Sequence, residues 1–325
     1  MHLKSKNLVP LTDLIGNHSG CMLYTYTPQD SAKCLNTRSI VFVGDSVTRK
    51  LFFQFANILD AKLPLAPPND NQKHSDHTFH SSTGGDITFF WDPFLNHSRT
   101  TDLLTTASYD TPIDLNRPAL LVLGSGLWYL HYANESDGVS AWQANIARHV
   151  STIKQQSVWP ADLIVMLPVE RVFPLKLTPE RTITMRPSDI DAMNTDLYHR
   201  VYPGGNGLGR TLSEGGRSGR MPIVLPKVFN EMLDATQTED GLHYNDKVMR
   251  AQANILLNLR CNDALPKKYP LNKTCCSRYP TPSLIHVFVL LLVLAWGPYS
   301  WIRMRKSGMG LVLSWTRRHL KSRSC

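Results

Sequence analysis

The chain carries IVFVGDSVTRKLFFQF at residues 40–55, where an apolar, β-branched run passes through a Gly-Asp-Ser turn into a helical pattern. Asp45 and Ser46 both suit a helix N-cap, because either side-chain oxygen accepts hydrogen bonds from the free N–H groups of the first turn. Ser46 could instead act as a nucleophile at the end of a buried strand. The local pattern favours the capped turn, so a catalytic Ser46 requires a base and an orienting acid elsewhere in the chain.

Apolar runs that resemble buried strands recur along the chain, with helical patterns between them. The runs lie at residues 39–44, 86–91, 119–124, 162–167 and 222–225, and the helical patterns at about 47–60, 138–157, 188–201 and 243–260. Continuous apolar strands are typical of parallel sheets covered on both faces. The alternation predicts an α/β fold, a three-layer α/β/α sandwich with a mainly parallel sheet, whose ligands bind at the carboxyl ends of the strands.

Two polar segments interrupt this pattern and are predicted to be loops. Residues 66–86 hold histidines among Ser, Asn and Asp, and residues 203–220 are rich in Gly and Arg. The histidines could be a metal site, but their irregular spacing favours a solvated insertion. The Gly-rich segment does not resemble a phosphate-binding loop, because no strand leads into it and no helix with Lys-Ser/Thr follows.

A candidate base lies in TEDGLHYNDKVMRAQANILLNLRCN at residues 238–262, where Asp240 and His243 form a D-x-x-H pair before an amphipathic helix. A serine hydroxyl is a poor nucleophile until a neutral imidazole takes its proton and a carboxylate holds that imidazole in the right tautomer. A surface Asp and His at a helix start are the alternative. The chain order of Ser46 after the first strand and the pair before the last helix favours the catalytic interpretation.

The 325 residues, with 42% hydrophobic and 19% charged composition, suit one large or two small globular domains. The segment LIHVFVLLLVLAWGPYSWI at 284–302 has His286 as its one ionisable group and predicts a transmembrane helix, because its length suits a hydrocarbon core of about 30 Å. The basic residues of 303–325 predict a cytosolic tail, which places residues 1–283 outside the cytosol. Juxtamembrane charge explains these residues more simply than nucleic-acid binding does.

Sequons and cysteines agree with an exoplasmic location. The sequons predict glycosylation at Asn17, Asn96, Asn134 and Asn272. Cysteines flank the domain at Cys21, Cys34, Cys261, Cys275 and Cys276, which predicts one or two disulfides of unresolved connectivity. No CxxC pair or His cluster gives metal-ligand spacing, so no metal is expected. Cys325 is expected in the cytosol, free or acylated.

Residues 1–20 contain no apolar run long enough for the core of a signal peptide. We therefore expect either a truncated start or a topology different from the one above. The expected domains are an N-terminal lead at 1–20, a catalytic domain at 21–283, the membrane helix at 284–302 and the tail at 303–325.

Five motifs carry a family resemblance: GCMLYTYTPQDSAKCL, FVGDSVTRKLFFQF, LVLGSGLWYL, DGLHYND and RCND with KTCCSRYPTP. In order and spacing they resemble the SGNH-hydrolase-like, or PC-esterase, domain of the glycan O-acetyltransferase family, over nearly all of residues 20–283. That family includes sialate and fungal capsule-polysaccharide O-acetyltransferases. The resemblance implies Ser46 as nucleophile, His243 as base and Asp240 as its partner.

Other site residues are predicted from chemistry and from the resemblance together. The backbone N–H of Ser46 at a helix N-terminus and that of Gly124 suit an oxyanion hole. In related enzymes an arginine three residues after the serine assists, which here is Arg49; a phosphate-like surface role or plain helix charge is the alternative. The Asn block of ordinary SGNH hydrolases has no clear counterpart, so a third donor is unassigned. Trp128 and Tyr129 form either a sugar platform or part of the core.

The expected function is O-acetyl transfer to glycan hydroxyls through an acyl-enzyme on Ser46. A carbohydrate O-acetylesterase on the same machinery and a catalytically silent glycan-binding module are the alternatives. No bound cofactor is expected, and the acetyl donor would be acetyl-CoA or a relayed acetyl group. Full-length relatives continue into a multi-span membrane module, so this chain is a stand-alone lumenal domain, a partner of a multi-span membrane protein or a truncated product. The resemblance implies the Golgi membrane.

Overall fold

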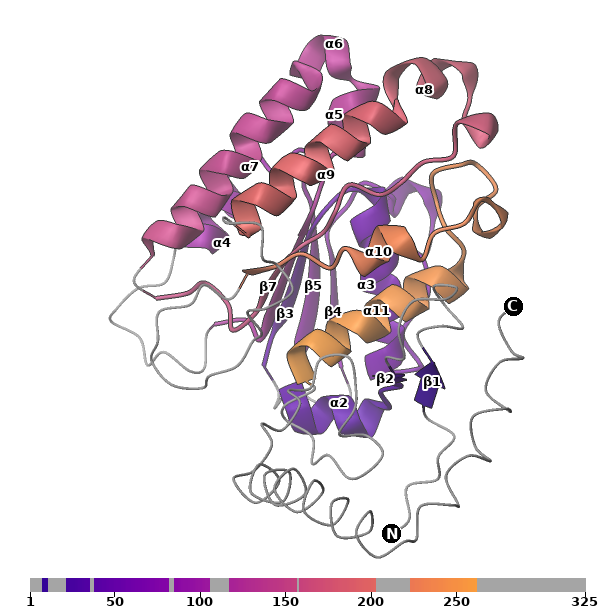
Figure 1. Ribbon diagram of the computed structural model, residues 1–325. Coiled ribbons are helices and arrows are strands. Elements are labelled where there is room, and N and C mark those ends of the chain that lie inside the picture. The colour runs from indigo at the N-terminus through magenta and orange to yellow at the C-terminus, as the bar shows by residue number, and fades with distance from the viewer. Residues whose placement is uncertain are drawn as a thin grey trace, which may run out of the picture. The chain divides into compact units, whose positions relative to one another are not determined.

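The computed structural model describes residues 8–10, 22–35, 38–81, 85–105, 117–156, 158–202 and 223–261. All of them belong to the first of two compact units, Met1–Ser277. They form a six-stranded mixed sheet with helices on both faces, which confirms the predicted α/β class (Figure 1).

The sheet has the strand order β4-β5-β3-β6-β7-β8. In chain order the strands are β3 (Ile40–Gly44), β4 (His77–His80), β5 (Asp86–Trp91), β6 (Leu120–Gly124), β7 (Ile164–Met166) and β8 (Ile223–Val224). Every apolar run predicted to be a strand contains one of these strands. Strand β3 pairs in parallel with both β5 and β6, so it lies near the centre of the sheet and its carboxyl end is flanked by theirs.

The prediction that residues 66–86 form a loop is wrong for β4, which pairs antiparallel with β5 at the edge of the sheet. Phe79 and His77 of β4 lie against the ring of Phe52. The strand pattern, with alternate residues facing the core, spans only a few positions here. The polar residues around it made the segment look like a loop in the sequence. A three-residue 3₁₀ helix is also present at Asp70–Gln72 within the same segment.

Helices cover both faces of the sheet. One face packs against α2 (Pro28–Leu35), α3 (Ser46–Leu59) and α11 (Asp246–Cys261), and the other against α4 (Ser98–Thr105), α5 (Leu127–His131), α7 (Gly138–Gln155) and α9 (Pro187–Val201). Strand β3 is apolar at successive positions because both of its faces are buried. Phe42 belongs to the core between the sheet and helices α3 and α11, and Val43 to the core between the sheet and helices α7 and α9.

The remaining elements are short. They are β1 (Leu8–Pro10), β2 (Met22–Tyr24), α6 (Ala133–Ser136), α8 (Pro179–Thr184), α10 (Val228–Glu231) and the 3₁₀ helices Pro174–Lys176 and Ala235–Gln237. Strands β1 and β2 form a separate antiparallel pair. The Asn258 side chain of α11 accepts from the Tyr24 N–H and donates to the Tyr24 carbonyl, so α11 holds β2 in place.

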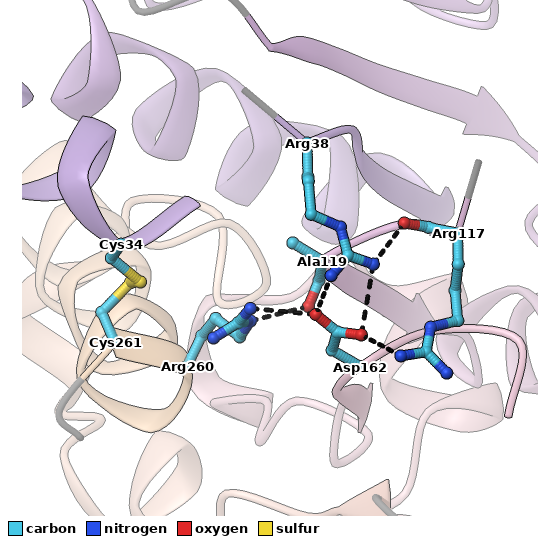
Figure 2. Close-up of polar contacts among 7 residues, drawn as sticks. All are labelled: Cys34, Arg38, Arg117, Ala119, Asp162, Arg260 and Cys261. Atoms are coloured by element: carbon cyan, nitrogen blue, oxygen red, sulfur yellow. Dashed lines mark hydrogen bonds and ion pairs between the residues drawn. A yellow bond between two sulfur atoms is a disulfide. The ribbon is translucent and has the colours of Figure 1, made fainter. Parts of the chain in front are cut away.

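A disulfide joins Cys34 at the end of α2 to Cys261 at the end of α11, 227 residues apart (Figure 2). It agrees with the expectation of at least one bond between the two flanks of the domain. Cys21, Cys275 and Cys276 lie outside the described residues.

Several predictions concern residues outside the described part of the chain: the membrane helix at 284–302, the tail at 303–325, the Gly-rich loop at 203–220, and the sequons at Asn17 and Asn272. Within the described ranges, no helix has the length and apolar character that a membrane span needs.

Candidate active site

The sequence left open whether Asp45 or Ser46 caps the helix and whether Ser46 is a nucleophile, and the structure gives the two residues separate roles. Helix α3 begins at Ser46, and Asp45 is its N-cap: the Asp45 carboxylate accepts from the N–H groups of Val47 at 3.0 Å and Thr48 at 3.3 Å. Burial raises the pKa of Asp45, whose side chain is almost fully enclosed. Because Asp45 satisfies the first turn of the helix, the Ser46 hydroxyl remains available for another contact.

That contact is with His243. The distance from Ser46 Oγ to His243 Nε2 is 3.0 Å, and His243 Nδ1 lies 2.7 Å from Asp240 Oδ2. These distances allow a hydrogen-bonded chain from hydroxyl to imidazole to carboxylate, in which His243 carries its proton on Nδ1 and accepts at Nε2. The structure therefore brings together the three residues that the sequence predicted as nucleophile, base and orienting acid.

The loop before α11 holds Asp240 in place. Its Oδ1 accepts from the backbone N–H of His243 at 2.7 Å and of Leu242 at 2.9 Å. Partial burial alone would raise the pKa of Asp240, but these bonds and its contact with the His243 ring outweigh burial and lower that pKa to about 2. Asp240 is therefore ionised at neutral pH and stabilises a positively charged His243.

Glycine is required within this loop. Gly241 adopts a φ of +77°, and a Cβ there would lie 2.7 Å from the carbonyl oxygen of Phe173. The Gly241 carbonyl in turn accepts from the Phe173 N–H at 2.9 Å. The spacing of Asp240 and His243 thus depends on a tight turn that a larger residue would strain.

The two glycines at the strand ends let α3 approach the sheet closely. Gly44 of β3 and Gly124 of β6 are register partners, and a Cβ on Gly44 would lie 2.2 Å from the Gly124 carbonyl oxygen. A Cβ on Gly124 would lie 2.3 Å from Thr48 Oγ1. Gly124 is thus beside the turn that carries Ser46, and its role as an oxyanion donor stays a prediction. The Ser46 N–H, at the first position of α3, has no partner within the helix.

Arg49 lies one helical turn after Ser46 and packs over Trp91, with 5.5 Å from its guanidinium carbon to the ring centroid. Burial lowers the pKa of Arg49. Its Nη1 is buried and has no hydrogen-bond partner among the described residues. Arg49 therefore presents a charged donor that is already partly stripped of water, which is the state in which such a group binds an anion or a developing negative charge strongly.

Trp128 belongs to a cluster of half-exposed rings. It lies edge-on to Trp91 at 5.4 Å and tilts against Tyr132 at 5.2 Å. Tyr129, by contrast, is buried and donates from its hydroxyl to the Phe94 carbonyl at 2.8 Å. Of the two alternatives for these residues, sugar platform or core, Tyr129 belongs to the core. Trp128 is half-exposed and contacts Trp91, over which Arg49 packs.

Sequence reasoning missed Trp91. The feature that could have identified Trp91 as a site residue is its position at the end of the predicted strand 86–91, because ligands of α/β proteins bind at the carboxyl ends of the strands. Only the order of the strands shows that β5 lies beside β3 and so brings Trp91 next to Arg49. Trp91 also lines a hollow of about 370 Å³ together with His74, Asp76 and Arg99.

A second hollow, of about 550 Å³, lies against Tyr132, Phe94, Asn96 and Arg148. The sequon residues Asn96 and Asn134 are both exposed, so their side chains are accessible for the predicted glycosylation. Among the described residues, no group of three or more His, Cys, Asp or Glu side chains could hold a metal ion.

No family model matches the chain. In sequence it is 23% identical over 292 residues to the N-acetylneuraminate (7)9-O-acetyltransferase of Danio rerio. The match covers 87% of this chain and 33% of that protein, so the chain spans about a third of the length of this relative.

Solved structures with a similar fold include a protein described as an acylhydrolase from Bacteroides fragilis, with a TM-score of 0.43 and 13% identity over 73% of this chain and 95% of that one. Another is an acetylxylan esterase from Geobacillus stearothermophilus, with a TM-score of 0.38 and 9% identity over 71% and 97% of the two chains. Both structural similarities are weak. Over most of its length, the chain therefore resembles in sequence one part of an N-acetylneuraminate O-acetyltransferase.

Proposed function

We propose that this chain is a glycan O-acetyltransferase domain that works through an acetyl-enzyme on Ser46. The observation that carries the proposal is the contact of Ser46 Oγ with His243 Nε2 at 3.0 Å, backed by the contact of His243 Nδ1 with Asp240 at 2.7 Å. The sequence similarity to an N-acetylneuraminate O-acetyltransferase supports the acetyl group and a sugar as reactants.

In the first half of the reaction, Ser46 Oγ attacks the carbonyl carbon of the acetyl donor while His243 Nε2 takes the hydroxyl proton. Asp240 stabilises the resulting imidazolium. The tetrahedral intermediate carries its negative charge on the former carbonyl oxygen, toward the Ser46 N–H, with Gly124 and Arg49 as the further proposed donors. The bond to the leaving group then breaks, His243 returns the proton to it, and Ser46 is left as an acetyl ester.

In the second half, a sugar hydroxyl replaces the donor. His243 takes its proton as the hydroxyl oxygen attacks the acetyl carbon, and the collapse of the second intermediate breaks the bond to Ser46 Oγ, which regains a proton from His243. The products are an O-acetyl sugar and the free enzyme. The acetyl donor is a co-substrate, either acetyl-CoA or an acetyl group relayed by a multi-span membrane protein.

We place the acceptor sugar against Trp128 and Trp91. Trp128 is half-exposed and suits the apolar C–H face of a pyranose, whereas the ring of Trp91 carries a stacked His74 and the guanidinium of Arg49, which supplies a charged donor. The hollow of about 370 Å³ that Trp91 lines falls within the size range of small-molecule sites.

Hydrolysis is the second candidate, and one observation favours it. The side chains of His243 and Asp240 are 34% and 43% exposed, so water can reach the base. With water in place of the sugar hydroxyl, the same steps release acetate, which is the reaction of a carbohydrate O-acetylesterase.

The test uses the purified chain with an acetyl donor and a panel of oligosaccharides, and follows the acetyl group into sugar and into free acetate. Acetylated sugar that disappears in a Ser46→Ala variant supports the transferase. Acetate alone, at every donor and acceptor concentration, supports the esterase. A wild-type chain that binds glycan but reacts with neither donor nor a fluorophosphonate would make it a silent binding module.

We further propose that residues 1–283 lie in the lumen of the secretory pathway, in the Golgi, with a membrane anchor at 284–302. The Cys34–Cys261 disulfide supports an oxidising compartment, and the exposed Asn96 and Asn134 support glycosylation there.

A further inference from the structure

A buried acidic residue beneath the candidate site has no role in the chemistry described above. Glu170 follows β7, and only 6% of its surface is exposed. Its Oε1 accepts from the side-chain amide of Gln252 in α11 at 3.3 Å. Its Oε2 is buried and has no hydrogen-bond partner among the described residues. A buried carboxyl oxygen without a partner is costly, and the cost is far greater if the group is ionised.

Glu170 shares a small cavity with the N-cap of α3. The cavity measures about 20 Å³ and is lined by Asp45, Thr48, Gly124, Ser125 and Glu170 among others. The Ser125 hydroxyl is a second buried group there without a partner among the described residues. Two carboxyl groups thus line one space with room for about one water molecule, so a proton on one of them removes the repulsion between two like charges.

The segment that carries Glu170 also supports the loop of His243. The Phe173 N–H donates to the Gly241 carbonyl at 2.9 Å, and the Tyr244 hydroxyl donates to the Arg171 carbonyl at 2.5 Å. Glu170 therefore lies between the turn that positions Ser46 and the loop that positions His243.

We propose that Glu170 is a positioning residue that acts in its protonated form: the neutral acid does not repel the carboxylate of Asp45 across the shared cavity, and so keeps the turn that places Ser46 for attack. This inference rests on the proposed role of Ser46 as nucleophile. Glu170 does not touch the reacting atoms.

The charge belongs on Asp45 because Asp45 accepts two backbone N–H bonds at the start of a 14-residue helix, whereas Glu170 accepts one amide bond. Burial raises the pKa of Glu170 to about 8, the bond from Gln252 lowers it, and the charge of Asp45 raises it. Five ionisable or hydrogen-bonding groups act on Glu170 from the elements around it. They are Asp45 at the N-cap of α3, Lys50 within α3, Asp240 and Tyr244 of the loop before α11, and Gln252 of α11.

This arrangement has a defined pH dependence. Below about pH 8 Glu170 is neutral and the turn is held, whereas above it a second negative charge faces Asp45 and the turn is released. The folded-state pKa lies above the ordinary value of 4.5, so the folded protein binds a proton that the unfolded chain lacks between these values. Glu170 therefore makes the protein less stable as pH rises from about 4.5 to about 8.

The activity test measures acetyl release from p-nitrophenyl acetate between pH 6 and 10. We expect the wild type to lose activity about tenfold per pH unit well above pH 8, as for a single ionisation. Glu170→Gln, whose amide is neutral and has the shape of the protonated acid, is expected to rescue the activity that Glu170→Ala loses and to abolish this alkaline loss. Glu239→Gln, an exposed neighbour of Asp240, is the matched control and is expected to keep the wild-type profile.

A second measurement does not require activity. Thermal unfolding is followed at pH 5 and pH 8 for the wild type and Glu170→Gln, and the substitution is expected to raise the melting temperature more at pH 8. An equal effect at both pH values, or a Glu170→Gln variant that keeps the alkaline loss, would overturn the proposal. A wild type without esterase activity or fluorophosphonate labelling would instead refute the proposed function, while the unfolding comparison still tests the protonation of Glu170.

Discussion

At the scale of single residues, Asp45 and Ser46 separate a structural role from a chemical one. Asp45 lies in extended conformation, so its carboxylate turns back onto the N–H groups of the first helical turn. Ser46 is already helical, and its hydroxyl points to His243. The two neighbours therefore give opposite predictions for the same kind of substitution.

Ser46→Ala is expected to abolish acetyl transfer and acetate release while it changes the free energy of unfolding by less than about 0.5 kcal/mol, because it removes a hydroxyl that supports no packing. Asp45→Ala is expected to cost about 1 to 2 kcal/mol, because the helix loses its cap. Chemical denaturation and turnover of both variants check this. A Ser46→Ala variant that retains turnover would exclude the acyl-enzyme.

Asp240→Asn is expected to lower kcat by about 10⁴, because an amide does not hold His243 in the tautomer that accepts at Nε2. The folded-state pKa of Asp240 is lowered to about 2, below its ordinary value of 3.8. The stability that this carboxylate contributes is therefore present above about pH 4 and is lost as pH falls toward 2. Melting temperatures of wild type and variant should differ at pH 6 and converge near pH 2. A gap that stays constant would contradict an ionised Asp240.

At the scale of elements, an ion cluster fastens the amino ends of the strands, opposite the end that carries Ser46. Asp162, just before β7, contacts Arg38 at 2.5 Å, Arg117 at 2.6 Å and Arg260 at 3.0 Å (Figure 2). Arg38 precedes β3, Arg117 precedes β6 and Arg260 is near the end of α11. Arg260 also donates to the Ala119 carbonyl at 3.0 Å. One carboxylate thus joins three strands and a helix.

Asp162→Ala is expected to lower the free energy of unfolding by about 3 kcal/mol, because it leaves three partly buried guanidinium groups without their shared anion. The activity of the molecules that remain folded should not change, since the cluster is at the opposite end of the sheet. Asp196→Ala breaks a single pair with Arg200 within α9 and is the control, with an expected cost below about 0.5 kcal/mol. Equal costs for the two variants would show that the Asp162 cluster does not act as a unit.

At the scale of the whole molecule, the Cys34–Cys261 disulfide joins α2 to α11, two helices that lie on the same face of the sheet but are far apart in the chain, with the two cysteines separated by 227 positions. A bond of this span persists in an oxidising compartment and is reduced in the cytosol. The disulfide and the exposed sequons therefore test the same proposal about location.

For the expressed chain we expect an endoglycosidase to increase electrophoretic mobility, and Asn96→Gln with Asn134→Gln to reduce that change. In sealed microsomes the globular part should be protected from added protease, and thiol-labelling should find Cys34 and Cys261 oxidised. A chain without a mobility change that is digested from outside would overturn the lumenal location and, with it, glycans of the secretory pathway as the substrate.

The sequence predicted the buried strands correctly but missed strand β4 in the predicted loop 66–86, and burial explains both outcomes. Residues 40–44 and 120–124 are buried on both faces, so a continuous apolar run identifies them without any partner. Strand β4 is an edge strand with polar residues on one face, and its pairing with β5 stabilises it more than its own composition does. The sequence marked Trp91 only by its place at the end of the predicted strand 86–91 and gave no signal for Glu170, because the roles of both residues depend on neighbours from other parts of the chain.

The sequence alone was enough to predict the α/β class, the strand-to-helix turn at Ser46 and the pairing of Asp240 with His243, because each depends on residues within a few positions of one another. Tertiary structure decided which of Asp45 and Ser46 caps the helix, that His243 reaches Ser46 across 197 positions, and that Glu170 shares a cavity with Asp45. The physical reason is the strand order, which seats β3 between β5 and β6 and brings Trp91, Ser46 and Gly124 to one edge of the sheet. Contacts between residues so far apart in the chain follow from how the sheet packs, which no local pattern encodes.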